Sequence, residues 1–99
     1  MMASMSIHEA VRVPPRIAFR RVGDEMALVN LDTGVYYGLD AVGARMWELL
    51  AGDGRLHAVA ARMQEEFDVA PDQLEADVIR LASELLAKGL VERAGDGAP

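Results

Sequence analysis

The stretch LDTGVYYGLDAVGARMWELL, residues 31–50, changes its pattern half-way along. Residues 35–39 are mostly β-branched, aromatic or apolar, and the DTG before them is a turn signal, so a strand entered through a hairpin turn is expected. From Asp40, a favourable N-cap residue, apolar side chains recur at helical spacing until Gly52. The stretch therefore predicts a strand that leads directly into a helix.

Two more strands precede this unit. In RIAFRRV, residues 16–22, Ile17 and Phe19 alternate with arginine and alanine, which is the period of a strand. EMALVNL, residues 25–31, is a continuous apolar run of strand length. Together with the strand that follows, these segments predict a three-stranded antiparallel meander between residues 16 and 39.

Two further helices follow the first. An apolar stripe runs from Leu56 to Phe67, and a third helix is expected to begin at Pro71 and to end before Gly89. Residues 90–93 then form a short strand or simply cover the core. Because three strands cannot bury a face alone, the helices must pack on one side of the sheet. The predicted fold class is α+β, a three-stranded antiparallel sheet followed by three helices.

The chain of 99 residues suits one domain. Residues 1–15 show no periodicity and are interpreted as a flexible N-terminal arm, residues 16–93 as the folded domain, and residues 94–99 as a disordered tail. No stretch has the length and apolar character of a signal peptide or a membrane span, so a cytoplasmic protein without membrane contact is expected.

Charge and cysteine content exclude several functions. The net charge is −6, and because residues 1–21 carry +3, the rest of the chain carries −9. An acidic body disfavours binding to a phosphate backbone, so no nucleic-acid partner is expected. The absence of cysteine excludes disulfides, thiolate metal sites and cysteine nucleophiles.

No set of residues points to catalysis. His8 and His57 lie 49 positions apart without metal-ligand spacing, and the three serines lack a histidine and a carboxylate placed to activate them. The acidic run of residues 65–77 is interpreted as a solvated face. We therefore expect no catalytic residue, no metal, no cofactor and no enzymatic activity.

One edge of the predicted sheet has no partner. The last strand of a meander pairs on one side only. Its open edge is either protected against unwanted pairing with other chains or used as a docking site for an extended peptide. Tyr36 and Tyr37 must face opposite ways, one toward the helices and one toward solvent or a ligand. The third helix is apolar over a wide arc, which fits a helix wedged between two layers or one that lines a groove.

The chain resembles the PqqD-like family of precursor-peptide recognition elements across residues 16–92. The resemblance rests on Gly34, Tyr36, Tyr37, Leu39, Gly43, Met46, Trp47, Leu50, Asp77, Val78, Gly89 and Leu90. It implies a winged helix-turn-helix fold without chemistry of its own. Such proteins bind the leader segment of a ribosomally made precursor peptide, which adds as a strand beside the third strand and lies against the third helix.

The resemblance also implies a binding site and partners. The implied leader-binding residues are Val35, Tyr36, Tyr37 and Gly38 on the strand and Leu74, Asp77, Val78, Leu81, Glu84 and Leu85 on the helix. The implied partners are a precursor leader peptide and a modifying enzyme, with a lasso-peptide leader peptidase favoured over the pyrroloquinoline-quinone pathway.

Two other classes of function compete with this one. A winged-helix DNA-binding regulator has the same element order, but the third helix with Lys88 carries a net charge of −2, which opposes entry into a DNA groove. A small module that pairs with itself through the open edge is the other alternative. We expect a monomer or a weak dimer.

Overall fold

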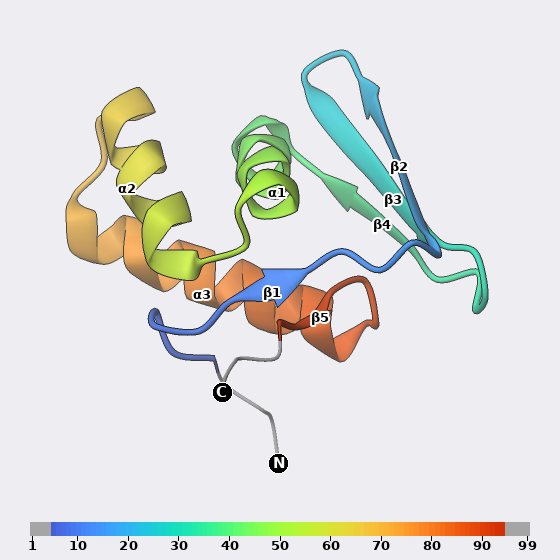
Figure 1. Ribbon diagram of the computed structural model, residues 1–99. Helices are drawn as coiled ribbons and strands as arrows, with labels where there is room; N and C mark the ends of the chain where they lie inside the picture. The colour runs from blue at the N-terminus through green and yellow to red at the C-terminus, as the bar shows by residue number, and fades with distance from the viewer. Residues whose placement is uncertain (1–4, 95–99) are drawn as a thin grey trace.

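Three strands form the antiparallel sheet that the sequence predicts. The computed structural model describes residues 5–94, and residues 1–4 and 95–99 lie outside the described part. Strands β2 (Ile17–Val22), β3 (Glu25–Asn30) and β4 (Tyr36–Leu39) pair in the order β2-β3-β4 (Figure 1). The two hairpin turns contain Gly23 and Gly34, whose φ angles of 66° and 78° are ones that side-chain-bearing residues rarely adopt.

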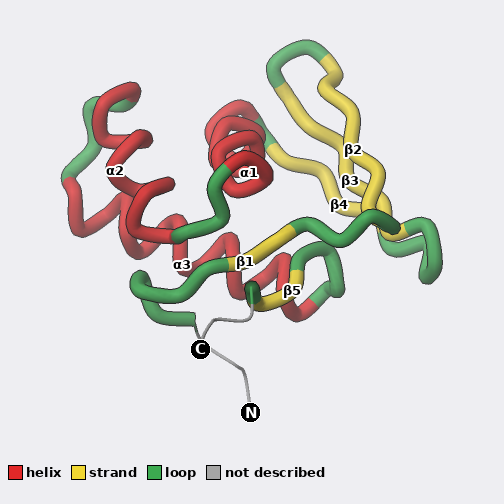
Figure 2. The backbone as a smooth tube through the Cα atoms, viewed as in Figure 1, coloured by secondary structure: helices red, strands yellow, loops and turns green. Residues whose placement is uncertain are grey.

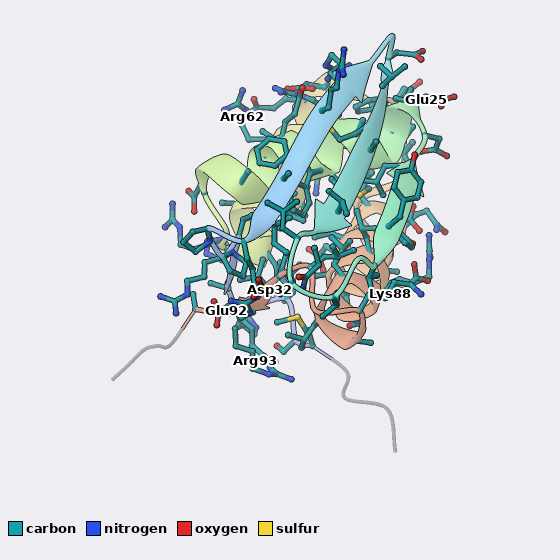
Figure 3. All side chains as sticks on the ribbon, turned by 90° about the vertical axis from the view of Figure 1, so that its right-hand side faces the viewer. Glu25, Asp32, Arg62, Lys88, Glu92 and Arg93 are labelled. Atoms are coloured by element: carbon teal, nitrogen blue, oxygen red, sulfur yellow. The ribbon has the colours of Figure 1, made fainter. Side chains whose placement is uncertain are left out.

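The register separates the two faces of the sheet. Phe19, Leu28 and Tyr37 lie side by side on one face, and Ala18, Val29 and Tyr36 lie side by side on the other. The first face packs against the helices, because Leu28 is fully buried there. The second face is turned away from them, as Figure 3 shows by looking onto the sheet with the helices behind it.

The three predicted helices are present in the expected order. They are α1 (Ala41–Gly52), α2 (Leu56–Glu66) and α3 (Pro71–Ala87). Asp40 caps α1 by accepting a hydrogen bond from the Gly43 N–H at 2.9 Å. α3 begins at Pro71 and ends before Gly89, which has a φ of 73°. The predicted fold class, α+β with a three-stranded antiparallel sheet and three helices, is confirmed.

Trp47 lies at the centre of the core, where it contacts the sheet. The spacing of α1 suggested a residue at the core edge, but Trp47 has no exposed surface. Its indole meets the Phe19 ring edge-to-face at 5.3 Å between centroids. The side chain is one step off the narrow stripe of α1, and it is buried because both the sheet and the other helices pack around this helix.

Residues 5–15 of the predicted flexible arm, which spans residues 1–15, are packed against the domain, and this corrects the prediction for them; residues 1–4 lie outside the described part. β1 (Val11–Arg12) pairs antiparallel with β5 (Glu92–Arg93) beside α3 (Figure 2). Met5 and Val11 are both buried. A Cβ at Gly54 would lie 1.7 Å from the Val11 carbonyl oxygen, so only glycine fits this crossing. The folded unit therefore includes residues 5–15, and within residues 90–93 only Glu92 and Arg93 form a strand.

The same pairing extends to the other terminus. The Ala94 N–H donates to the Ala10 carbonyl at 3.0 Å. The predicted disordered tail therefore has an ordered first residue, and its residues 95–99 lie outside the described part.

Asn30 fastens the β3–β4 hairpin to the end of α3. It is the one buried polar residue in the described part. Its Nδ2 donates to the Gly89 carbonyl at 3.1 Å, and its Oδ1 accepts from the Asp32 and Thr33 N–H groups at 2.9 and 3.2 Å. These bonds satisfy the buried amide and fix where β4 begins relative to α3.

A chain of ion pairs joins β2, α1 and α2 on the surface. Arg21 pairs with Glu48, and Arg45 pairs with Glu48 and, at 2.6 Å, with Glu66. Hydrogen bonds from Arg21 lower the pKa of Glu48, and those from Arg45 lower the pKa of Glu66. Both carboxylates are therefore held in the charged form.

No helix within residues 5–94 has the length and apolar character that crossing a membrane requires. The same residues contain no group of three or more side chains arranged to hold a metal ion.

Candidate functional site

The outer edge of β4 presents unpaired backbone groups. In the register with β3, Asn30 and Val35 form a hydrogen-bonded pair, with the Asn30 N–H 2.9 Å from the Val35 carbonyl oxygen. Bonded and non-bonded pairs alternate along an antiparallel ladder, so Tyr37 and Leu39 are the next residues bonded to β3. The N–H and C=O groups of Tyr36 and Gly38 consequently point away from the sheet and are available to another strand.

The two edges of the sheet differ in charge. β2, at the opposite edge, contains Arg20 and Arg21 and is preceded by Arg16, and charged side chains on an edge strand discourage pairing with another chain. β4 has the sequence YYGL and contains no charged residue. Of the two edges, only that of β4 is therefore suited to accept an extended peptide.

A groove runs beside this edge. It lies between β4, the first turns of α1 and the middle of α3, and it encloses about 250 Å³. We call it the β4–α3 groove; its lining residues are Tyr37, Gly38, Leu39, Asp40, Val42, Gly43, Met46, Asp77, Arg80, Leu81 and Glu84.

Half of the predicted site residues line this groove. They are Tyr37 and Gly38 on β4 and Asp77, Leu81 and Glu84 on α3. Asp77, Leu81 and Glu84 recur every three or four positions and so share one face of α3. Tyr36 belongs to the opposite face of the sheet, where its side chain is 68% exposed, but its backbone forms part of the open edge.

The other four predicted residues do not line the groove in the free chain. Leu74, Val78 and Leu85 are at most 2% exposed and belong to the core beneath the groove. They form the narrow stripe of α3 that is buried in the core, so they support the groove without offering surface to a peptide. The Val35 N–H already donates to Thr33 Oγ1, and its carbonyl accepts from Asn30.

Sequence reasoning missed the contribution of α1 to the groove. Asp40, Val42, Gly43 and Met46 line it because α1 starts immediately after β4 and its first turns close one end. The signal was present in the sequence, since a strand that leads directly into a helix must bring the two together. Arg80 was also missed, and it lies between Asp77 and Glu84 on the rim of α3.

Polar contacts connect the two walls of the groove. Tyr37 on β4 donates its hydroxyl hydrogen to Glu84 Oε1 on α3 at 2.7 Å, and this bond raises the pKa of the Tyr37 phenol. Asp77 accepts a hydrogen bond from Gln73 and forms an ion pair with Arg80, both at 2.9 Å. Three carboxylates and one arginine line the groove, so its rim is acidic.

Comparison with protein families identifies the chain. The model of the family described as coenzyme PQQ synthesis protein D (PqqD) matches residues 25–91, which is more than half of the sequence. The chain belongs to the PqqD family. The matched region of this PqqD-family chain runs from β3 to the residue before β5 and so includes every residue that lines the β4–α3 groove.

A solved structure extends the comparison beyond the family model. The PqqD-family chain is 32% identical to the protein in the structure titled "TbiB1 in Complex with the TbiA(beta) Leader Peptide", with a TM-score of 0.79. The similarity covers 86% of this chain and 99% of the other. No curated protein matches the chain.

Proposed function

We propose that this chain binds the leader segment of a ribosomally made precursor peptide and presents the precursor to a modifying enzyme. The leader adds as a strand to the open edge of β4 and lies in the β4–α3 groove. The single observation that carries this proposal is the juxtaposition of an uncharged, unpaired strand edge with a groove along the adjoining helix.

The geometry of a strand determines how a leader is read. Tyr36 and Gly38 each offer one N–H and one C=O, so up to four backbone hydrogen bonds hold the leader regardless of its sequence. Alternate leader side chains point toward the helices, where Leu81, Val42 and Met46 supply apolar contacts. Backbone pairing thus supplies affinity, and the groove supplies selectivity.

The rim of the groove favours a basic leader side chain. Glu84 and Asp77 lie on α3 at the groove, and Asp77 is already partly neutralised by Arg80 at 2.9 Å. Glu84 accepts a hydrogen bond from the Tyr37 phenol and forms no ion pair with any cation in the described part of the chain. A lysine or arginine of the leader beside Glu84 therefore gains a charge-assisted hydrogen bond.

The pathway and the enzyme partner are also part of the proposal. The solved structure of TbiB1 with a leader peptide supports a lasso-peptide pathway over the quinone-cofactor pathway. The enzyme that we propose for this pathway is a leader peptidase. In this scheme the chain contributes binding and orientation in the cytoplasm, and the bond-breaking groups belong to the peptidase.

The alternative of a DNA-binding winged helix has a physical argument against it. α3 carries Asp72, Glu75, Asp77 and Glu84 against Arg80, and a helix of this charge is repelled by phosphates.

Fluorescence anisotropy tests the proposal. The probe is a labelled synthetic leader whose sequence comes from a search of the neighbouring genes for a short precursor reading frame, and a 20-base-pair DNA duplex is the comparison. We expect saturable leader binding in the micromolar range or tighter and no sequence-dependent DNA binding at about 150 mM salt. Leader binding no tighter than that of a scrambled peptide would contradict the proposal.

A further inference from the structure

The sheet carries an apolar face that nothing in the described part of the chain covers. Antiparallel sheets with one face in water normally alternate apolar and polar residues, whereas a continuous apolar run is typical of a strand covered on both faces. β3 is such a run: Met26 and Leu28 face the helices, and Ala27 and Val29 face the other way. Figure 3 shows that no element lies in front of this second face.

We call this surface the outer face. It consists of residues from all three strands: Ala18, Arg20, Ala27, Val29, Tyr36 and Gly38. A shallow hollow of about 340 Å³ lies on it, beside the Tyr36 side chain. Two more exposed apolar side chains flank it, Val22 at the end of β2 and Leu31 directly after β3. Contiguous exposed apolar surface of this kind marks interaction sites.

The charge on the outer face indicates the chemistry of a partner. Arg20 lies at the centre of β2 on this face and forms no ion pair with any residue in the described part of the chain. It stands on a chain whose net charge is −6. A partner surface that combines apolar side chains with a carboxylate complements this arrangement.

The outer face is continuous with the proposed leader-binding edge. Tyr36 and Gly38 belong to both, because their backbone groups point to the open edge and their Cα substituents point to the outer face. A leader strand added to β4 widens the sheet by one strand. Half of its side chains then enter the groove, and the other half become part of the outer face. Only this face displays the protein and the bound leader together.

We infer that the outer face is the docking surface for the modifying enzyme, which reads the protein and its bound leader as one continuous surface. The inference rests on the proposed function, since it requires a leader on β4. It explains why β3 is apolar on both sides and why the outer-face arginine is left without an ion-pair partner. It also implies that the enzyme binds the leader-loaded protein more tightly than the empty one.

Two substitutions test this without touching the groove. Ala27→Glu places a carboxylate in the middle of the outer face, directly across from Arg20 in the register. The new Glu and Arg20 can form an ion pair, which keeps the strand folded and neutralises the charge of Arg20. Arg20→Glu reverses the charge. Gln64→Glu, on the exposed surface of α2, makes the same change in charge as Ala27→Glu at a site remote from the sheet and serves as the matched control.

The measurement is cleavage of the precursor by the leader peptidase, both taken from the neighbouring genes that the same search identifies, at saturating precursor. We expect both outer-face variants to bind the labelled leader within twofold of the original chain and to reduce the stimulated cleavage rate at least tenfold. Gln64→Glu should leave both unchanged. The affinity of the peptidase for the protein, by biolayer interferometry, should rise at least fivefold when the leader is present.

Three outcomes overturn the inference, and each differs from a failure of the proposed function. Full stimulation by both variants shows that the enzyme docks elsewhere. Loss of leader affinity in the variants shows that the face acts through the groove. Sedimentation as a dimer that Arg20→Glu dissociates shows that a second copy of the chain occupies the face. By contrast, failure of the unmodified chain to bind the leader refutes the proposed function itself.

Discussion

Replacement of Gly38 by proline tests the proposed strand addition at a single atom. The Gly38 N–H points to the open edge and makes no bond to β3, so its loss does not remove a bond from the existing sheet. A Cβ at this position meets nothing within 4 Å. Proline is therefore tolerated in the free protein, whereas in the complex its ring occupies the place where the leader backbone approaches.

The expected loss follows from the hydrogen bonds that strand addition forms. Removal of one donor leaves the leader carbonyl unpaired in the interface, which costs about 1–3 kcal/mol. A loss of roughly 2 kcal/mol corresponds to about 30-fold weaker binding. Gly38→Ala keeps the N–H and is the matched control, for which we expect a change of less than about twofold, well under 1 kcal/mol.

Anisotropy titration of the labelled leader into both variants gives the two affinities. Circular dichroism and the fluorescence of Trp47, the single tryptophan, confirm that both are folded. If the proline variant binds the leader as tightly as the alanine variant, the leader does not pair with this edge and the reasoning is refuted.

Three further predictions concern the groove, the hairpin and the surface ion pairs. Leu81→Ala should weaken leader binding about tenfold, or roughly 1.5 kcal/mol, because an apolar contact with the leader is lost. Leu86 is half-buried outside the groove, so Leu86→Ala should leave the leader affinity unchanged. Equal losses of affinity would show that both substitutions act through the stability of the fold. Asn30→Ala should lower the free energy of unfolding, measured in urea, by roughly 2–3 kcal/mol, because the Gly89 carbonyl and two turn N–H groups lose their hydrogen-bond partner. A change below about 0.5 kcal/mol would contradict the role of Asn30 in joining the hairpin to α3. The pKa values of Glu48 and Glu66 are lowered in the folded state, so the charged carboxylates stabilise the fold above the unfolded pKa of 4.5. This stabilisation is lost as the pH falls below that value, so the Tm should fall in acid. Arg45→Gln should make the Tm fall less steeply with pH.

Local patterns were sufficient to predict the sheet and the helices. Asp40 as an N-cap, Pro71 as a helix start and Gly89 as a helix end are decided by a few neighbouring residues, and the structure agrees at each. The β1–β5 pairing was not predictable in this way. Val11 pairs with Arg93, and most of the sequence lies between these two residues. Strands of two residues are also too short to show a period of apolar residues.

The candidate site was predicted in position and partly in composition. The open edge of β4 follows from counting strands, whereas the groove residues on α3 were implied by the family resemblance, and three of them belong to the most regular apolar stripe. That stripe, Leu74, Val78 and Leu85, is regular because it is core. Leu81 lies where the stripe meets the surface, and only the packing of β4 and α1 against α3 decides that it lines the groove.

Amide hydrogen exchange, followed by NMR with and without the leader, tests the central claim most directly. In the free chain the Tyr37 and Leu39 amides are bonded to β3, whereas those of Tyr36 and Gly38 face solvent at the open edge. We predict that the leader slows exchange at Tyr36 and Gly38 by at least tenfold, so that protection becomes continuous along β4. Unchanged exchange at both, with new protection on α2 or β1 instead, would contradict strand addition to β4.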